Sequence, residues 1–164
     1  MDRTALNGAF VSLLNDHRGA IHRVCRTYAD TTDEREELAQ EVVYQLWRAY
    51  PSYRGAAAPL TWVYRIALNA AFSALRKRAR RPAHTPLDEA SQVPAAAPRS
   101  DDRAELLYRA IRRLGDVERA LVACHLDGLS YKETAEVLGI SEVNVGVRLT
   151  RTKARLKEIV QEME

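Results

Sequence analysis

The stretch SYKETAEVLGISEVNVGVRLTR, residues 130–151, carries the clearest structural signal in this chain of 164 residues. Ser130 followed three residues later by Glu133 is the capping-box pattern that begins a helix. Gly139 stands where a helix-ending left-handed turn favours a residue without a Cβ, and Ser141 is suited to cap the next helix. The small Ala135 allows two helices to cross closely, and Ile140 fills the turn. The sequence therefore predicts two packed helices joined by a tight glycine turn.

The second helix of this pair has a cationic stripe beside its apolar one. Its apolar side holds Val145, Leu149, Leu156 and Val160. At about 100° per residue, a neighbouring stripe collects Asn144, Arg148, Arg151 and Arg155. Two helices joined by a glycine turn, the second of them cationic, have the geometry of a helix-turn-helix that enters the major groove of DNA. The alternative is a packed helical hairpin whose arginines are only solvated.

Opposite the apolar side of the same helix lie Val143, Val147 and Thr150, which we expect to be exposed. Exposed valines are common on protein surfaces, but on a helix in the major groove they can contact thymine methyl groups. Gly146 costs the helix about 1 kcal/mol relative to alanine. It either has no role or permits a close approach to the helix backbone.

The first 81 residues also have helical periodicity. Apolar residues from Leu6 to Tyr28, interrupted at His17, predict one long amphipathic helix. A second helix is expected from near Asp33, where acidic residues crowd the first turn, to just before Pro51. A third begins near Pro59 and ends in RKRARR, residues 76–81.

The segment 82–103 differs from both flanks because it contains four of the six prolines and has no apolar period. We expect an extended linker there, too poor in large apolar groups to fold alone. The predicted fold is all-α, with two small helical domains at 1–81 and 104–164 joined by this linker.

Charge and cysteine content narrow the class of protein. The net charge of the whole chain is +3, but residues 1–81 carry 13 basic and 8 acidic side chains, which fits local contact with a polyanion.

The chain opens without the apolar core of a signal peptide and has no apolar run near 18 residues, so we expect a cytoplasmic protein. Cys25 with His22 one helical turn away could begin a metal site, but a buried thiol fits Cys25 better, and we predict no metal site, no cofactor and no enzymatic activity.

Two faces of the N-terminal half have contrasting chemistry. The third helix interleaves aromatic, amide and cationic side chains on the side that we expect to face away from its core: Trp62, Arg65, Asn69, Phe72, Ser73, Arg76 and Arg80. This mixture suits unpaired bases, which stack on rings while cations hold phosphates, although core packing is the better explanation for any single aromatic. The second helix has an acidic face that is either solvated or reserved for a protein partner, and it holds Glu37, Gln40, Glu41, Tyr44 and Arg48.

Three segments in this order resemble bacterial RNA polymerase sigma factors of the small extracytoplasmic-function class, which have only the second and fourth conserved regions. The segments are DEREELAQEVVYQLW at 33–47, LTWVYRIALNAAFSALRKRARR at 60–81, and the helix-turn-helix after the proline-rich linker. The resemblance covers nearly the whole chain. It implies a protein that binds core RNA polymerase and directs promoter recognition, DNA melting and transcription initiation.

The resemblance also implies roles for individual residues. Docking on the polymerase, at the clamp helices of its β′ subunit, would involve Glu37, Leu38, Gln40, Glu41 and Tyr44. The β subunit is a further expected partner, with no residues assigned to it. Capture of the melted −10 element would involve Tyr53, Trp62, Arg65, Asn69, Arg76, Lys77 and Arg80. Reading of the −35 element as duplex would involve Ser141, Asn144, Val147, Arg148, Arg151 and Arg155. An anti-sigma protein is a further partner that such factors commonly have.

The recognition helix departs from the family pattern. A Thr-Val-Lys-Ser-Arg run is common there, whereas this chain has Asn144-Val145-Gly146-Val147-Arg148. We therefore predict a more apolar, thymine-tolerant reading of the −35 element. Other departures are Ser73, where an aspartate is frequent, and Gly115, where a proline is frequent.

One rival interpretation is a two-domain helix-turn-helix regulator that is not a polymerase subunit. It would need an N-terminal α/β receiver domain, and residues 1–81 show no strand alternation.

Overall fold

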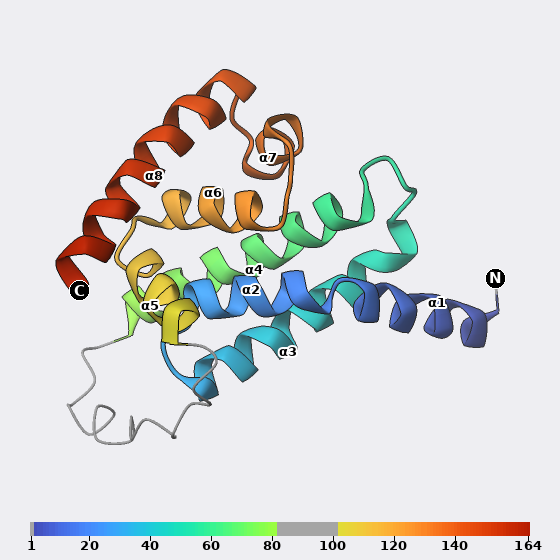
Figure 1. Cartoon of the computed structure of the whole chain (residues 1–164). Coiled ribbons are helices and arrows are strands. Elements are labelled where there is room, and N and C mark those ends of the chain that lie inside the picture. The colour runs from blue at the N-terminus through green and yellow to red at the C-terminus, as the bar shows by residue number, and fades with distance from the viewer. Residues whose placement is uncertain (1, 82–101) are drawn as a thin grey trace.

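The computed structural model describes residues 2–81 and 102–164, and within these ranges every regular element is helical (Figure 1). The elements of the N-terminal lobe, residues 2–81, are α1 (Arg3–Asp16), α2 (Arg18–Tyr28), α3 (Thr32–Ala49), the short 3₁₀ helix η1 (Tyr50–Ser52) and α4 (Pro59–Arg80). Those of the C-terminal lobe, residues 102–164, are α5 (Asp102–Ile111), α6 (Asp116–Leu126), α7 (Tyr131–Leu138) and α8 (Glu142–Met163). The predicted all-α class is confirmed.

The N-terminal lobe is built on three helices, α2, α3 and α4, which pack against one another. The apolar stripe of α3 is buried at Leu38, Val42 and Leu46, as its spacing predicts. Thr31 caps this helix by accepting a hydrogen bond from the Glu34 backbone N–H at 3.1 Å, and acidic residues in its first turn complement the helix dipole. Pro59 opens α4, where its missing N–H costs nothing.

The prediction of one long N-terminal helix is wrong, because the helix is interrupted at His17. This residue has φ −117° and ψ 18°, outside helical values, so α1 ends at Asp16 and α2 starts at Arg18. Phe10 is the buried residue of α1, whereas α2 buries most of one face, including Val24, Cys25 and Tyr28. Figure 1 shows α1 projecting away from the rest of the lobe. The apolar period continues across the break because both helices bury apolar residues in the same core.

The C-terminal lobe contains the predicted helix-turn-helix. Ser130 and Glu133 form the complete capping box at the start of α7, and Gly139 ends the helix in the left-handed region at φ 70°. Ser141 caps α8 by accepting a hydrogen bond from the Asn144 backbone N–H at 3.1 Å. The two helices and α6 enclose a small apolar cluster centred on Leu121, Val145 and Leu149, against which Ala135 and Ile140 pack.

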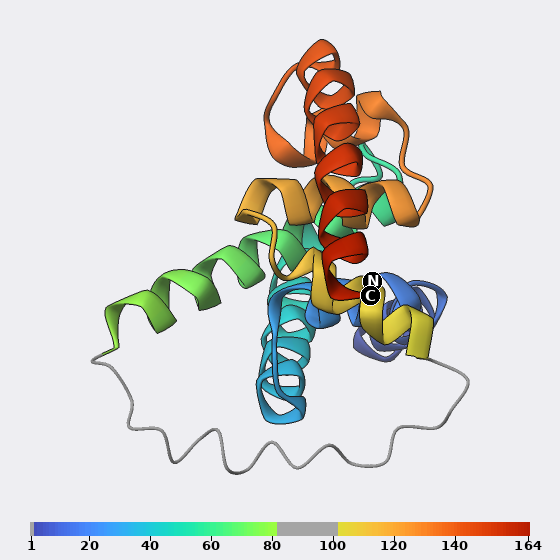
Figure 2. The same cartoon turned by 60° about the vertical axis from the view of Figure 1, so that its left-hand side comes forward.

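The two lobes share a hydrophobic core. The cluster that holds the core of the N-terminal lobe also includes Ala120, Ala123, Cys124 and Leu129. Helix α6 contacts both α2 and α4, and α7 contacts α4, as the two views together show (Figures 1 and 2). The expectation of two domains on a tether therefore omitted a contact that joins them. Most of the predicted linker 82–103 lies outside the described residues, and its last two residues, Asp102 and Arg103, belong to α5.

The described helices include none that is long and apolar enough to cross a membrane.

The capping box gives a direct test of how α7 is held. Replacing Ser130 by alanine removes the side-chain acceptor for the Glu133 backbone N–H, which lies at 3.1 Å. We expect the free energy of unfolding, measured by urea denaturation, to fall by about 1 kcal/mol. The control, Ser12→Ala on the exposed side of α1, changes it by less than about 0.5 kcal/mol. Equal effects of the two substitutions would contradict a stabilising role for the cap.

Candidate polymerase and nucleic-acid interfaces

Helix α3 presents an outward face of mixed chemistry. Glu37, Gln40, Glu41 and Tyr44 are exposed on it, and Tyr44 keeps 54% of its accessible surface. The guanidinium of Arg48 lies 5.8 Å from the centre of the Tyr44 ring. Leu38, to which the resemblance gave a polymerase contact, is only 3% exposed and packs in the core. Four of the five predicted polymerase contacts therefore form a surface, and the fifth holds the helix that carries them.

Next to this face lies a shallow apolar depression that the sequence analysis missed. It is lined by Phe10, Ala39, Gln40, Val43, Tyr44 and Trp47. The ring centres of Phe10 and Trp47 are 5.0 Å apart, which ties α1 to α3. Phe10 lies among the apolar residues from Leu6 to Tyr28, but its spacing in the sequence does not say that its ring meets Trp47. The α3 face is thus wider and more apolar than the acidic residues alone indicate.

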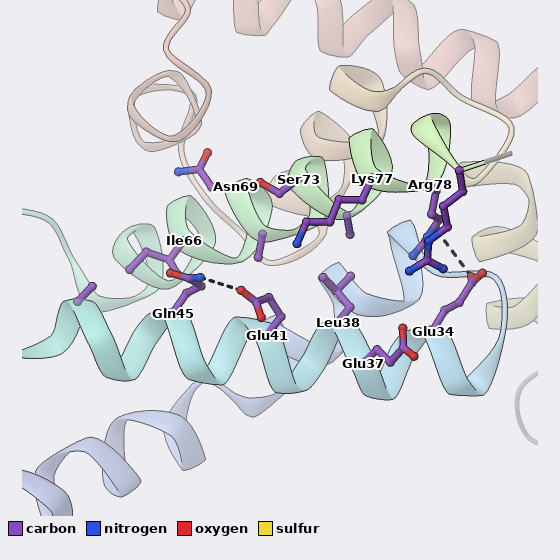
Figure 3. Close-up of a pocket in the computed structure, with 14 residues that line it drawn as sticks. Glu34, Glu37, Leu38, Glu41, Gln45, Ile66, Asn69, Ser73, Lys77 and Arg78 are labelled. Carbon is purple, nitrogen blue, oxygen red and sulfur yellow. Dashed lines mark hydrogen bonds and ion pairs between the residues drawn. The ribbon is translucent and has the colours of Figure 1, made fainter.

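A cleft of about 540 Å³ runs between α3 and α4, and its two walls differ in charge (Figure 3). Glu34, Glu37 and Glu41 come from α3, whereas Lys77 and Arg78 come from α4. Arg78 and Glu34 approach to 3.7 Å across one end, and Glu41 accepts a hydrogen bond from Gln45 at 2.7 Å. The α4 wall also carries two of the polar groups considered for base contact, Asn69 and Ser73.

Helix α4 keeps most of its predicted DNA-binding side chains exposed. These are Arg65, Asn69, Arg76, Lys77 and Arg80. The basic residues of its last turn are in the favourable position for the helix dipole, and Arg76 also donates a hydrogen bond to the Ser73 hydroxyl at 3.1 Å. The surface is cationic toward the C-terminal end of the helix.

The prediction that Trp62 lies on the free face of α4 is wrong. It is 8% exposed and stacks on Tyr53 with ring centres 4.6 Å apart and planes at 28°. Tyr53 donates a hydrogen bond from its hydroxyl to the Ala57 carbonyl at 2.6 Å, which braces the loop before α4. The ring of Tyr50 in η1 also lies 6.3 Å from that of Trp62, so a side chain that helical spacing leaves open is covered by tertiary contacts. Phe72 is likewise half-buried and lies edge-on to Tyr28.

Two arginines of the cationic stripe on the recognition helix α8 form ion pairs with glutamates of this chain. Arg148 pairs with Glu118 of α6 at 3.1 Å, and Arg155 pairs with Glu158 at 3.2 Å. Arg151 and Asn144 are exposed beside them. Ser141 uses its hydroxyl as the cap of the helix. The predicted −35 residues do lie together near the start of α8, with Arg155 farther along.

The two cysteines are both buried, as predicted. Burial raises the pKa of the Cys25 thiol to about 11 and that of Cys124 to about 12, so both stay protonated at neutral pH. Among residues 2–81 and 102–164, no group of three histidine, cysteine or acidic side chains is placed to hold a metal ion.

Models of two conserved regions match this chain on the segments just described. Residues 13–81 match sigma-70 region 2, and residues 104–156 match sigma-70 region 4. The chain belongs to the sigma-70 family of RNA polymerase sigma factors. It is a member of the extracytoplasmic-function (ECF) class, whose members are non-catalytic subunits that direct promoter recognition and transcription initiation. The rival interpretation as a receiver-type regulator is not supported, since the described part of residues 1–81 is helical throughout its regular elements.

Similar proteins agree with this assignment. The chain is 31% identical over 153 residues to the ECF RNA polymerase sigma factor SigM of Mycobacterium tuberculosis, covering 93% of this chain and 77% of that one. It is also 31% identical over 139 residues to the ECF RNA polymerase sigma-E factor of Escherichia coli, covering 76% and 73%.

Two solved structures share the fold at 21% identity. The sigma factor RpoE in complex with the anti-sigma factor NepR from Bartonella quintana has a TM-score of 0.73 and covers 93% of this ECF sigma factor. CnrH in complex with the cytosolic domain of CnrY has a TM-score of 0.68 and covers 96%.

Substituting Trp62 tests whether its side chain is buried in the lobe. We expect Trp62→Ala to lower the free energy of unfolding by about 3 kcal/mol, because a large buried ring and its stacking on Tyr53 are lost. Asn69→Ala, on the exposed side of the same helix, should change it by less than about 0.5 kcal/mol. Thermal or urea unfolding of the purified variants measures both, and a Trp62 effect as small as that of Asn69 would contradict the buried position.

Proposed function

We propose that the N-terminal lobe of this ECF sigma factor binds core polymerase and the melted −10 element, while the C-terminal lobe binds the −35 element as duplex. The observation that carries the division is the placement of three distinct exposed faces on three different helices. The α3 face is acidic and aromatic, the α4 surface is cationic with amide groups, and α8 is the second helix of a capped helix-turn-helix. An acidic face repels DNA, so it is suited to a protein partner, whereas the other two faces suit nucleic acid.

The polymerase contact is proposed for Glu37, Gln40, Glu41 and Tyr44, with the neighbouring apolar depression at Trp47 extending it. Tyr and Trp are side chains that commonly dominate protein interfaces, and charged groups around them set specificity. Leu38 supports this surface from inside the lobe.

The −10 contact is proposed for Arg65, Asn69, Arg76, Lys77 and Arg80, together with the ring of Tyr53. Bases leave the duplex stack at a cost of a few kcal/mol each, and ring stacking and phosphate contacts offset that cost. Trp62 acts here as a positioning residue, because its buried ring stacks on that of Tyr53 and is not itself exposed to a base.

The −35 contact is proposed for Asn144, Val147, Arg148 and Arg151, with Ser141 at the helix N-terminus and Arg155 nearer the flanking phosphates. Side chains near the start of a recognition helix contact base edges, and arginine is the commonest specific reader of guanine.

Two further parts of the proposal concern the setting of the protein. The similar structure from Bartonella quintana holds the sigma factor RpoE in complex with the anti-sigma factor NepR, and we include an anti-sigma partner for this chain as well. Because bacterial core polymerase works in the cytoplasm, we place this protein there.

The α3 face is tested by reversing one charge. Glu41→Lys should weaken the complex with bacterial core polymerase at least tenfold and reduce run-off transcription in proportion, because a cation replaces an acidic contact at the interface. Asp16→Lys is the control, since Asp16 is an exposed acidic residue at the end of α1 and is not among the proposed contacts. Polymerase affinity is measured with fluorescently labelled full-length chain, and start sites are mapped by sequencing the transcripts.

Equal effects of the two substitutions would remove the α3 face from the proposal. Failure of the unmodified chain to bind core polymerase, or to initiate at any site, would overturn the proposed function as a whole.

A further inference from the structure

The exposed side of the recognition helix is unusually apolar for a surface that we propose to meet DNA. Val143 is 77% exposed and Val147 is 44% exposed, and both lie opposite the buried Val145 and Leu149. Thr150 continues the same side, and its hydroxyl is occupied by a hydrogen bond to the Gly146 carbonyl at 2.9 Å. This stripe therefore offers methyl groups and no lysine or free serine hydroxyl.

A tyrosine from the preceding helix widens the stripe. A Cβ built on Gly146 would lie 3.2 Å from Cε2 of Tyr131, so the ring rests against the helix backbone where a side chain would otherwise stand. Tyr131 nevertheless keeps 46% of its surface exposed. It is the first residue of α7, directly after the capping residue Ser130, which fixes the start of the helix. The absence of a side chain at Gly146 thus lets Tyr131 lie beside the base-reading side of α8.

We propose that Tyr131, Val143 and Val147 are specificity-determining residues that read thymine methyl groups in the major groove of the −35 element. The proposal rests on the assignment of α8 to that element. The C5-methyl of thymine is the one apolar group that the major groove displays, and apolar side chains distinguish it by contact. Exposed apolar side chains lose water on contact with a methyl group, which favours thymine over every base that lacks one.

The sharpest test removes only the methyl group. Duplexes bound by holoenzyme assembled from the full chain and core polymerase are first selected from a random library, and each thymine in the selected −35 region is then replaced by uracil. We expect uracil to weaken binding about three- to fivefold at one or two positions. In Val147→Ser and Val143→Ser holoenzymes the same replacements should have little effect at the corresponding positions.

Tyr131 is tested by paired substitutions. Tyr131→Phe keeps the ring and should keep the methyl preference, whereas Tyr131→Ala should lose part of it. Gly146→Ala should push the ring aside and alter the preference without removing a groove-facing group. Ser12→Ala, on α1, serves as a control that leaves selection unchanged.

The outcomes are distinct. Sequence-specific selection with no effect of uracil at any position overturns this inference alone, as does an equal uracil effect in the serine variants. Selection of no sequence at all by an otherwise active holoenzyme overturns both the inference and the proposed role of α8.

Discussion

The carboxylate of Asp127 is the point at which the two halves of this sigma factor are joined. It is held by a cation from α2 and by a hydroxyl from α4, so three helices of two lobes converge on one group. Burial, together with the hydrogen bond to Asp127, raises the pKa of Tyr64, which keeps its hydroxyl protonated and able to donate. A carboxylate with little access to water is stable only when it is paired in this way. The position of α6 against the N-terminal lobe, and of α7 on α4, depends on that pairing and on the small residues Ala120 and Ala123 that allow close packing.

The 22 residues of helix α4 make different contacts on different sides of the helix. One side fills the core of its own lobe with Val63 and Ala67, and another receives the C-terminal lobe at Tyr64 and Leu68. What remains exposed is a narrow strip that becomes increasingly cationic toward Arg80. Because so much of the helix is covered, a change in the relation between the lobes alters how much of α4 is open to DNA.

The recognition helix shows how a local change in sequence alters chemistry without altering the fold. Its cap, its glycine turn and its buried residues are those expected of a helix-turn-helix, so its position is secured by features on its inner side. The outer side is free to vary, and here it has valines and a glycine that admits the ring of Tyr131. The inner side of α8 therefore fixes its position in the fold, while the outer side determines the chemistry of its exposed surface.

The sequence by itself determined the local elements and the family. Capping residues, Pro59 and Gly139 act through backbone groups within one turn of the chain, so the ends of α4, α7 and α8 follow from short-range chemistry, and the cationic and acidic faces follow from helical spacing. Only the tertiary structure decided which faces stay open. Trp62 was assigned to a binding surface because spacing gives the angle of a side chain round its helix but does not say what packs against it. Leu38 was assigned to the polymerase contact by the resemblance alone, although its spacing places it on the buried stripe of α3. The junction at Asp127 depends on Arg23, which lies 104 residues away along the chain, and a periodic pattern within one helix contains no information about such contacts.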